Sequence, residues 1–183
     1  MRLRVIGLVM MLALLLASGS VTNAEEKTEP VLSDKIKSTI VSQCDDLIAK
    51  LKTIDQDDIA TRIIRGRIYQ TDITDRLMLP LNRRVTDSRL DGSALVSVTA
   101  SYDAAVRSFS ASYSDYEDSM TKLIRIDCKN EPTQFYDALS IAREKRLELA
   151  DSVSSLQSLI VSYRDRVNDF VNSEIEASDD GKE

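Results

Sequence analysis

The most constraining feature of this sequence is an unbroken heptad pattern in its last part. Across residues 135–170, positions spaced alternately by four and three are apolar or aromatic at every step but one. The pattern comprises Phe135, Leu139, Ala142, Arg146, Leu149, Val153, Leu156, Ile160, Tyr163, Val167 and Phe170. A sustained repeat of about 3.5 residues directs one side of a helix toward a neighbouring helix and favours left-handed supercoiled packing. We therefore expect a long helix that packs lengthwise against another.

Arg146 is the one charged residue of this heptad seam. A polar residue at a core position of a coiled coil fixes the register of the helices at some cost in stability. We predict that Arg146 sets the register in this way. Antiparallel pairing about residue 130 makes Asp115 or Glu117 its expected partner.

A second helical pattern precedes the seam and lies between two turn signals. Gly92 follows Asp91 and can adopt positive φ, and Asn130 precedes Pro132, which suits a first helical turn. Between the turns, apolar and aromatic residues recur at helical spacing: Leu95, Val98, Tyr102, Ala105, Phe109, Tyr113, Tyr116, Met120 and Leu123. The sequence thus predicts helices over residues 93–128 and 132–176, antiparallel because the turns are short.

The region 33–88 carries a less regular pattern. Ser33 is a suitable N-cap. An apolar stripe runs through Ile36, Ile40, Cys44, Leu47, Leu51 and Ile54, then resumes one residue out of step at Ile59, Ile63, Ile73, Leu77 and Leu81. We expect one helix with a register slip near Asp57, or alternatively a turn there. Gly66 is expected to admit a close neighbouring helix, and Pro80 to kink the preceding turn.

These patterns predict an all-α fold, an elongated antiparallel three-helix bundle with coiled-coil-like heptad packing over residues 33–176. The alternative is four helices, with the first broken near Asp57. Only five Gly and three Pro occur in the chain, which agrees with long helices rather than a turn-rich β fold. Residues 25–32 are expected to be a flexible tether, and residues 177–183 a disordered acidic tail.

The N-terminus has the layout of a secretory signal peptide. A short basic start precedes residues 5–17, which are apolar apart from Gly7, and small residues follow up to Ala24. We predict a signal peptide over residues 1–24 and an extracytoplasmic protein, which would be secreted, periplasmic or at the cell surface. The apolar run is shorter than the roughly 20 residues that span a bilayer. The alternative is an uncleaved anchor over residues 5–21, and only in that case do we expect membrane association.

Cys44 and Cys128 are the only cysteines. In an oxidising compartment such a pair is expected to form one disulfide. Closing so long a loop stabilises a protein by up to roughly 4.5 kcal/mol in the chain-entropy model. A straight antiparallel bundle would, however, leave an axial mismatch of roughly 12 Å between the two residues, which a disulfide cannot span. The bridge therefore requires the first helix to be shortened or broken, or the helix ends to be more irregular than proposed.

No catalytic, metal-binding or cofactor-binding pattern is recognisable. His is absent, so a Ser-His-Asp triad cannot form, and the cysteines that zinc prefers are expected to be oxidised. Adjacent carboxylates, as at Asp57 and Asp58, point in different directions from a helix and are poor acid–base pairs. The net charge of −6 argues against nucleic acid as a partner. We therefore expect a protein that is not an enzyme, without metal or cofactor.

Arginine is locally enriched between residues 59 and 90. This segment contains seven arginines but only three aspartates. The arginines are Arg62, Arg65, Arg67, Arg76, Arg83, Arg84 and Arg89. One interpretation is a docking face for an anionic partner, such as an acidic protein, a cell-wall polymer or a lipid headgroup. The other, which we favour, is pairing with acidic residues of the next helix: Asp103, Asp115, Glu117 and Asp118.

Two functional hypotheses follow from this sequence. The first is a secreted or surface-associated structural or protein-interaction module, with an unidentified protein or cell-envelope partner. The second is a carrier that holds a small apolar molecule or lipid between its helices. An apolar strip left exposed along one helix would favour the first hypothesis. A cavity of several hundred Å³ would favour the second.

Overall fold

The computed structural model describes residues 32–180, and their side chains as far as Glu174. The predicted signal peptide (1–24), nearly all of the predicted tether (25–31) and residues 181–183 lie outside the described residues. From Leu32 onward the chain forms one compact unit. Leu32 itself is buried, so it belongs to the folded unit rather than to a tether.

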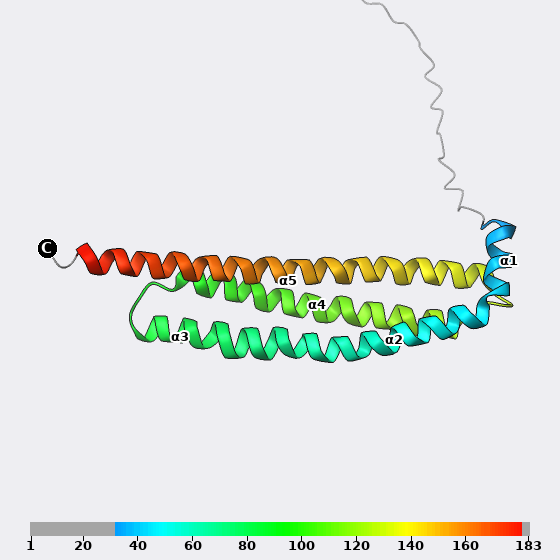
Figure 1. Cartoon of the computed structure of the whole chain (residues 1–183), viewed down its shortest axis with the longest axis horizontal. Helices are drawn as coiled ribbons and strands as arrows, with labels where there is room; N and C mark the ends of the chain where they lie inside the picture. Colours follow the sequence, from blue (N-terminus) through cyan, green and yellow to red (C-terminus); the bar gives the residue numbers. More distant parts are fainter. Residues whose placement is uncertain (1–31, 181–183) are drawn as a thin grey trace, which may run out of the picture. The chain divides into compact units, whose positions relative to one another are not determined.

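The described chain is helical throughout and contains no strand, which confirms the all-α prediction. Its elements are α1 (Asp34–Ser42), α2 (Cys44–Arg67), the π-helix η1 (Ile68–Met78), α3 (Leu79–Asp87), α4 (Ser93–Arg125) and α5 (Pro132–Asp180). Helices α2, η1 and α3 follow one another without interruption as one rod (Figure 1). Residues 177–180, predicted to lie in a disordered tail, continue α5.

The break in the first helix lies at Gln43, not near Asp57. Gln43 has φ −108° and ψ 11°, outside the helical region, and separates α1 from α2. Asp57 lies in the middle of an uninterrupted α2. Four helical rods therefore form, as in the predicted alternative, but α1 is short and turns away at one end of the unit (Figure 1). The predicted N-cap is confirmed, since the Ser33 hydroxyl accepts a hydrogen bond from the Ile36 amide at 3.4 Å.

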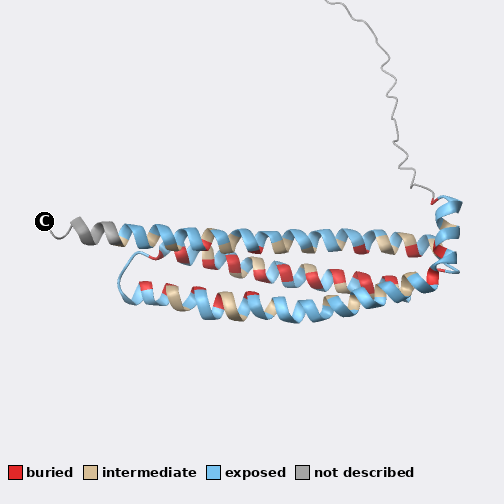
Figure 2. Cartoon of the chain, viewed as in Figure 1, coloured by how far each residue is buried: buried red, intermediate tan, exposed pale blue. Residues whose placement is uncertain are grey.

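Helix α4 is the central helix of the unit. It packs along α5 and also against α2, η1 and α3, and it carries more buried residues than any other element (Figure 2). Every residue of its predicted stripe is buried or half-buried. The heptad seam of α5 is also its packed face, with Arg146 as the one exposed seam residue. The two seams meet because each supplies a continuous apolar side at the same period.

The predicted disulfide between Cys44 and Cys128 is confirmed, with 5.7 Å between the two Cα atoms. Two departures from straight helices bring the cysteines together. The break at Gln43 makes Cys44 the first residue of α2. At the other side, α4 ends at Arg125 and Ile126 is extended (ψ 133°). An extended residue advances the chain by about 3.3 Å, compared with 1.5 Å for a helical residue. The α4–α5 connection therefore covers part of the axial distance between Cys44 and Cys128.

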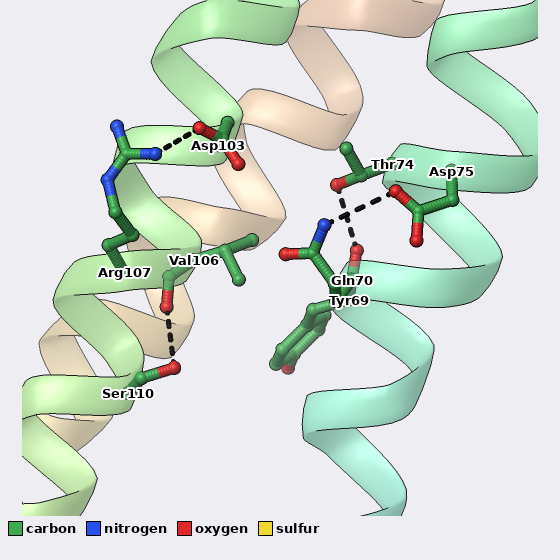
Figure 3. Close-up of polar contacts among 8 residues, drawn as sticks. All are labelled: Tyr69, Gln70, Thr74, Asp75, Asp103, Val106, Arg107 and Ser110. Carbon is green, nitrogen blue, oxygen red and sulfur yellow. Dashed lines mark hydrogen bonds and ion pairs between the residues drawn. The ribbon is translucent and has the colours of Figure 1, made fainter.

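The segment before Pro80, where a kink was expected, forms a π-helix. In a π-helix the bonds join residues five apart, and two side-chain hydrogen bonds of η1 follow that spacing. Thr74 Oγ1 donates to the Tyr69 carbonyl at 3.1 Å, and Gln70 donates to Asp75 at 3.3 Å (Figure 3). The facing α4 pairs residues four apart, as in Ser110 to the Val106 carbonyl. Pro80 has no amide hydrogen, so the regular pattern cannot continue through it.

The turn between α3 and α4 differs from the prediction in one respect. Gly92 has φ −95°, and the residue with positive φ is Arg89 (φ 60°). Arg89 closes α3 as a Schellman motif, with the Leu90 amide bonded to the Val85 carbonyl and the Arg89 amide to that of Thr86. Gly92 is needed for close approach instead, since a Cβ there would lie 2.8 Å from Cγ1 of Val85.

Candidate functional site

The middle of α2 is the least covered part of the unit. Between Cys44 and Tyr69 no residue of the rod is buried. No Cα atom of α2 lies within 8 Å of a Cα atom in the described length of α5, although both helices contact α4. An opening therefore remains between α2 and α5, with α4 as its floor.

Polar side chains of α2 face α4 beside this opening. The Tyr116 hydroxyl donates to Asp58 Oδ2 at 2.8 Å. Arg62 forms an ion pair with Glu117 and lies 5.2 Å from the centre of the Tyr113 ring, which is a cation–π distance. We call these five residues, Asp58, Arg62, Tyr113, Tyr116 and Glu117, the polar layer. Their contacts hold this part of α2 against α4.

The tyrosines of the polar layer are poor acids. Burial raises the pKa of Tyr113 to about 12, and the negative charges of Asp58 and Glu117 act in the same direction. Burial also raises the pKa of Tyr116, as do its hydrogen bond to Asp58 and the charge of that carboxylate. Both hydroxyls therefore keep their protons at neutral pH, and Tyr116 acts as a hydrogen-bond donor and not as a base.

Next to the polar layer lies an apolar groove of about 310 Å³. Its apolar lining comes from three helices: Leu47, Leu51 and Ile54 of α2, Tyr116 and Met120 of α4, and Phe135, Leu139 and Ala142 of α5. Lys50, Arg143 and Arg146 complete the lining, which contains no acidic residue. None of these three cations forms an ion pair within the described residues, where the ion pairs all involve other side chains.

Known proteins offer no template for this groove. No protein-family model, curated protein or solved structure matches the chain. In the part of the chain that the structure describes, no three His, Cys, Asp or Glu side chains come together as metal ligands would. No helix among the described residues is long and apolar enough to cross a membrane. The groove is therefore interpreted from its own residues.

Arg146 does not have the role that the seam pattern predicted. It is exposed at the groove instead of buried in a core, and Glu117, one of its expected partners, pairs with Arg62. Asp115, the other, forms no ion pair among the described side chains. The reason is that α2 does not close over this part of α5, so the seam position faces an opening.

The seven enriched arginines do not share one face. Arg62 alone pairs with an acidic residue of the next helix, and Arg76 pairs with Asp72 of its own helix at 3.0 Å. The remaining five form no ion pair within the described residues: Arg65, Arg67, Arg83, Arg84 and Arg89. Arg65 and Arg67 are two positions apart on a helix and point to nearly opposite sides. Cross-helix charge matching is thus wrong for most of the set, and an anionic docking role stays a prediction.

The outward side of the rod, from the second half of α2 to the first residue of η1, carries four exposed isoleucines. Ile63 is 68% exposed, and Ile59, Ile64 and Ile68 are also exposed. The sequence analysis placed Ile59 and Ile63 on an inward stripe, which is wrong. Ile59 and Ile63 lie on one side of the rod and Ile64 and Ile68 on the next, since residues four apart share a side. We call these four residues the isoleucine face.

Lys50 and Arg143 are the groove residues that the sequence analysis did not single out. Arg143 and Arg146 are three residues apart on α5 and so lie on the same side of that helix. That spacing is a sequence signal for a paired basic edge beside the seam. Lys50 has no comparable signal, because its place opposite the arginines depends on how far α2 stands from α5.

Proposed function

We propose that this protein is exported and acts by binding a partner protein, without catalysing a reaction. Two features support export. The N-terminal sequence has the layout of a signal peptide over residues 1–24. The Cys44–Cys128 disulfide closes the folded unit, and such bonds persist in oxidising compartments outside the cytoplasm.

The observation that carries the binding function is the isoleucine face. Four large apolar side chains are exposed within ten residues of one helix, in a segment where no residue is buried. The exposed part of these side chains contributes no burial to the fold, and contiguous exposed apolar residues are typical of interaction surfaces. A partner that covered them would gain the hydrophobic free energy that the fold leaves unused.

The charges around this face indicate the chemistry of the partner. Arg65 and Arg67 lie between Ile64 and Ile68 in the sequence, and neither forms an ion pair within the described residues. An amphipathic helix with acidic residues beside its apolar side fits both features, since it would cover the isoleucines and pair with the arginines. The proposed partner is therefore a protein with an acidic amphipathic segment.

A photo-crosslinking amino acid at Ile63, introduced in the producing cell, tests this proposal. The matched control places the same group at Gln157, which is exposed on α5. We expect one discrete adduct from position 63 and none from position 157, and its loss when Arg65 and Arg67 are both changed to glutamate. The absence of an adduct, or one indifferent to these arginines, would overturn the proposal. An adduct between two copies of this chain would mean that the isoleucine face mediates self-assembly and not binding to a different protein.

A second candidate function is supported by a different surface. The apolar groove has the several hundred Å³ expected of a ligand pocket, at the low end of the usual range. It lies between α2 and α5, where the carrier hypothesis placed a bound apolar molecule or lipid. We therefore keep a carrier function as the alternative. Binding at the groove and at the isoleucine face can be separated by substitution.

A further inference from the structure

The groove is unusual in combining an apolar lining with charge of one sign. Eight of its eleven lining residues are apolar or aromatic and the other three are Lys50, Arg143 and Arg146. The whole chain has a net charge of −6, so three cations without a lining carboxylate run against its overall balance. By contrast, the neighbouring pocket between α4 and α5 is lined by charges of both signs, with Asp115, Asp118 and Lys122 on α4 and Lys145 on α5. A ligand with a negative group would therefore complement the charges of the groove.

The cations occupy both walls of the groove. Arg143 and Arg146 are on the same side of α5, and Lys50 is on α2. The apolar floor between them is formed by α4, which carries Tyr116 and Met120. A ligand lying in the groove would therefore have an apolar body on the floor and an anionic group within reach of cations on the walls. Arginine is well suited to this because its planar fork binds a carboxylate through two parallel hydrogen bonds.

From this arrangement we propose that the groove binds one medium-chain fatty acid anion. Its alkyl chain lies along Leu47, Leu51, Phe135 and Leu139, and its carboxylate binds the cations. A volume of about 310 Å³ suits one alkyl chain rather than a two-chain lipid. The inference rests on the carrier alternative of the proposed function and is independent of the isoleucine face.

Calorimetric titration of the purified protein with dodecanoate, below its micellar concentration, tests the inference. We expect saturable binding of one dodecanoate per chain. Replacing Arg143 and Arg146 together by glutamine should weaken binding about tenfold or more, because each charge-assisted hydrogen bond lost is worth that much. Arg164→Gln, on an exposed arginine of α5 outside the groove, is the matched control and should leave the affinity unchanged.

The apolar wall is tested by a second matched pair. Ile54 lines the groove and is 38% exposed, so Ile54→Glu should be tolerated by the fold and should repel the ligand's carboxylate. Ile63→Glu puts the same charge on the same helix outside the groove and should bind dodecanoate like the unchanged protein. Circular dichroism of each variant verifies that the helices are retained. Equal affinities for the two variants would overturn the placement of the ligand.

The choice of ligand separates failure of the inference from failure of the carrier function. If dodecanoylglycerol, which has the same chain without a charge, binds as tightly as dodecanoate, the groove is a carrier site but the anion inference is wrong. If dodecyl phosphate binds more tightly than dodecanoate, the preferred ligand has a phosphate headgroup and not a carboxylate, and the inference is also wrong. Absence of saturable binding by all three amphiphiles would overturn both the inference and the carrier function.

Discussion

Helix α4 has two interfaces that differ in chemistry. Against α5 it presents a continuous apolar seam, with residues such as Tyr102 and Leu123 fully buried. Against the middle of α2 it presents the polar layer, and α2 contributes no buried residue between Cys44 and Tyr69. The first interface resembles the inside of a coiled coil, and the second resembles a contact between surfaces.

The difference shows how α2 is held in place. Its first residue is fixed by the disulfide to Cys128. Beyond its other end, Tyr69, Met78 and Val85 of the same rod enter the main apolar cluster. Between these anchors, Leu47, Ile48 and Leu51 in the first half of α2 pack against the second apolar cluster, and the second half is attached to α4 through the polar layer. A helix anchored at its ends can leave its middle open, and this is where both the groove and the isoleucine face occur.

Removal of the disulfide should cause the largest change. Cys44→Ser with Cys128→Ser should lower the free energy of unfolding by up to about 4.5 kcal/mol, because the loop of 84 residues is no longer closed in the unfolded chain. Hydrogen exchange should quicken most in the first turns of α2, which lose their anchor, while the α4–α5 interface stays protected. Thermal unfolding and exchange mass spectrometry measure both effects. Uniform loss of protection along α4 and α5 would contradict the end-anchored picture of α2.

The next largest effect is expected from truncating one apolar side chain on α5 and one on α2, because the two truncations should differ in their cost to the free energy of unfolding. Leu156 of α5 is fully buried (0% exposed), and Leu156→Ala should cost about 3 kcal/mol through lost burial and the cavity left behind. Ile63→Ala on α2 should change the free energy of unfolding by less than about 0.5 kcal/mol, since that side chain stays in water. Urea unfolding measures both. A large cost for Ile63→Ala would mean that the isoleucine face is covered in the isolated protein.

The same contrast explains what the sequence could and could not predict. Along α4 and α5 the apolar positions are continuous and period-matched, so helix, packed face and antiparallel pairing follow from the pattern. In the second half of α2 the apolar residues do not mark the inward side, although Leu47 and Leu51 of the first half pack inward as the stripe predicted. Asp58 and Arg62 face α4, while Ile63 and Ile64 face water. A pattern that assumes apolar residues point inward therefore assigns the wrong face.

Other differences arise from contacts that are distant in sequence. Gln43 ends α1 without a Gly or Pro signal, at the residue before the disulfide-bonded Cys44. Pro80 indicated an irregular turn, but not that a π-helix would precede it. The groove depends on the separation between α2 and α5, which no local pattern encodes. Lys50 and Arg143 could thus be recognised as neighbours only after the helices had been placed.

Two tyrosine hydroxyls should distinguish the interfaces by smaller amounts. The Tyr102 hydroxyl is buried in the apolar cluster and has no hydrogen-bond partner among the described residues, so Tyr102→Phe should stabilise the fold by about 1 kcal/mol. The Tyr116 hydroxyl donates to Asp58, so Tyr116→Phe should destabilise it by about 1–2 kcal/mol by removing a hydrogen bond to a charged group. Melting temperatures should move in opposite directions. Shifts of the same sign would show that the two interfaces do not differ in polarity as described.

The smallest expected effect tests how closely α2 approaches α4. Gly66 was expected to admit a close neighbour, yet a Cβ atom built at this position meets nothing within 4 Å. Gly66→Ala should therefore stabilise the protein by roughly 0.5–1 kcal/mol, because alanine loses less backbone entropy in a helix and meets no obstacle. Gly92→Ala is the informative counterpart, since its Cβ would lie 2.8 Å from Val85, and it should be destabilising. Gly92→Ala is expected to lower the melting temperature. If Gly66→Ala lowered it as well, a neighbouring helix would lie close to Gly66, and the description of α2 as loosely attached in its middle would be wrong.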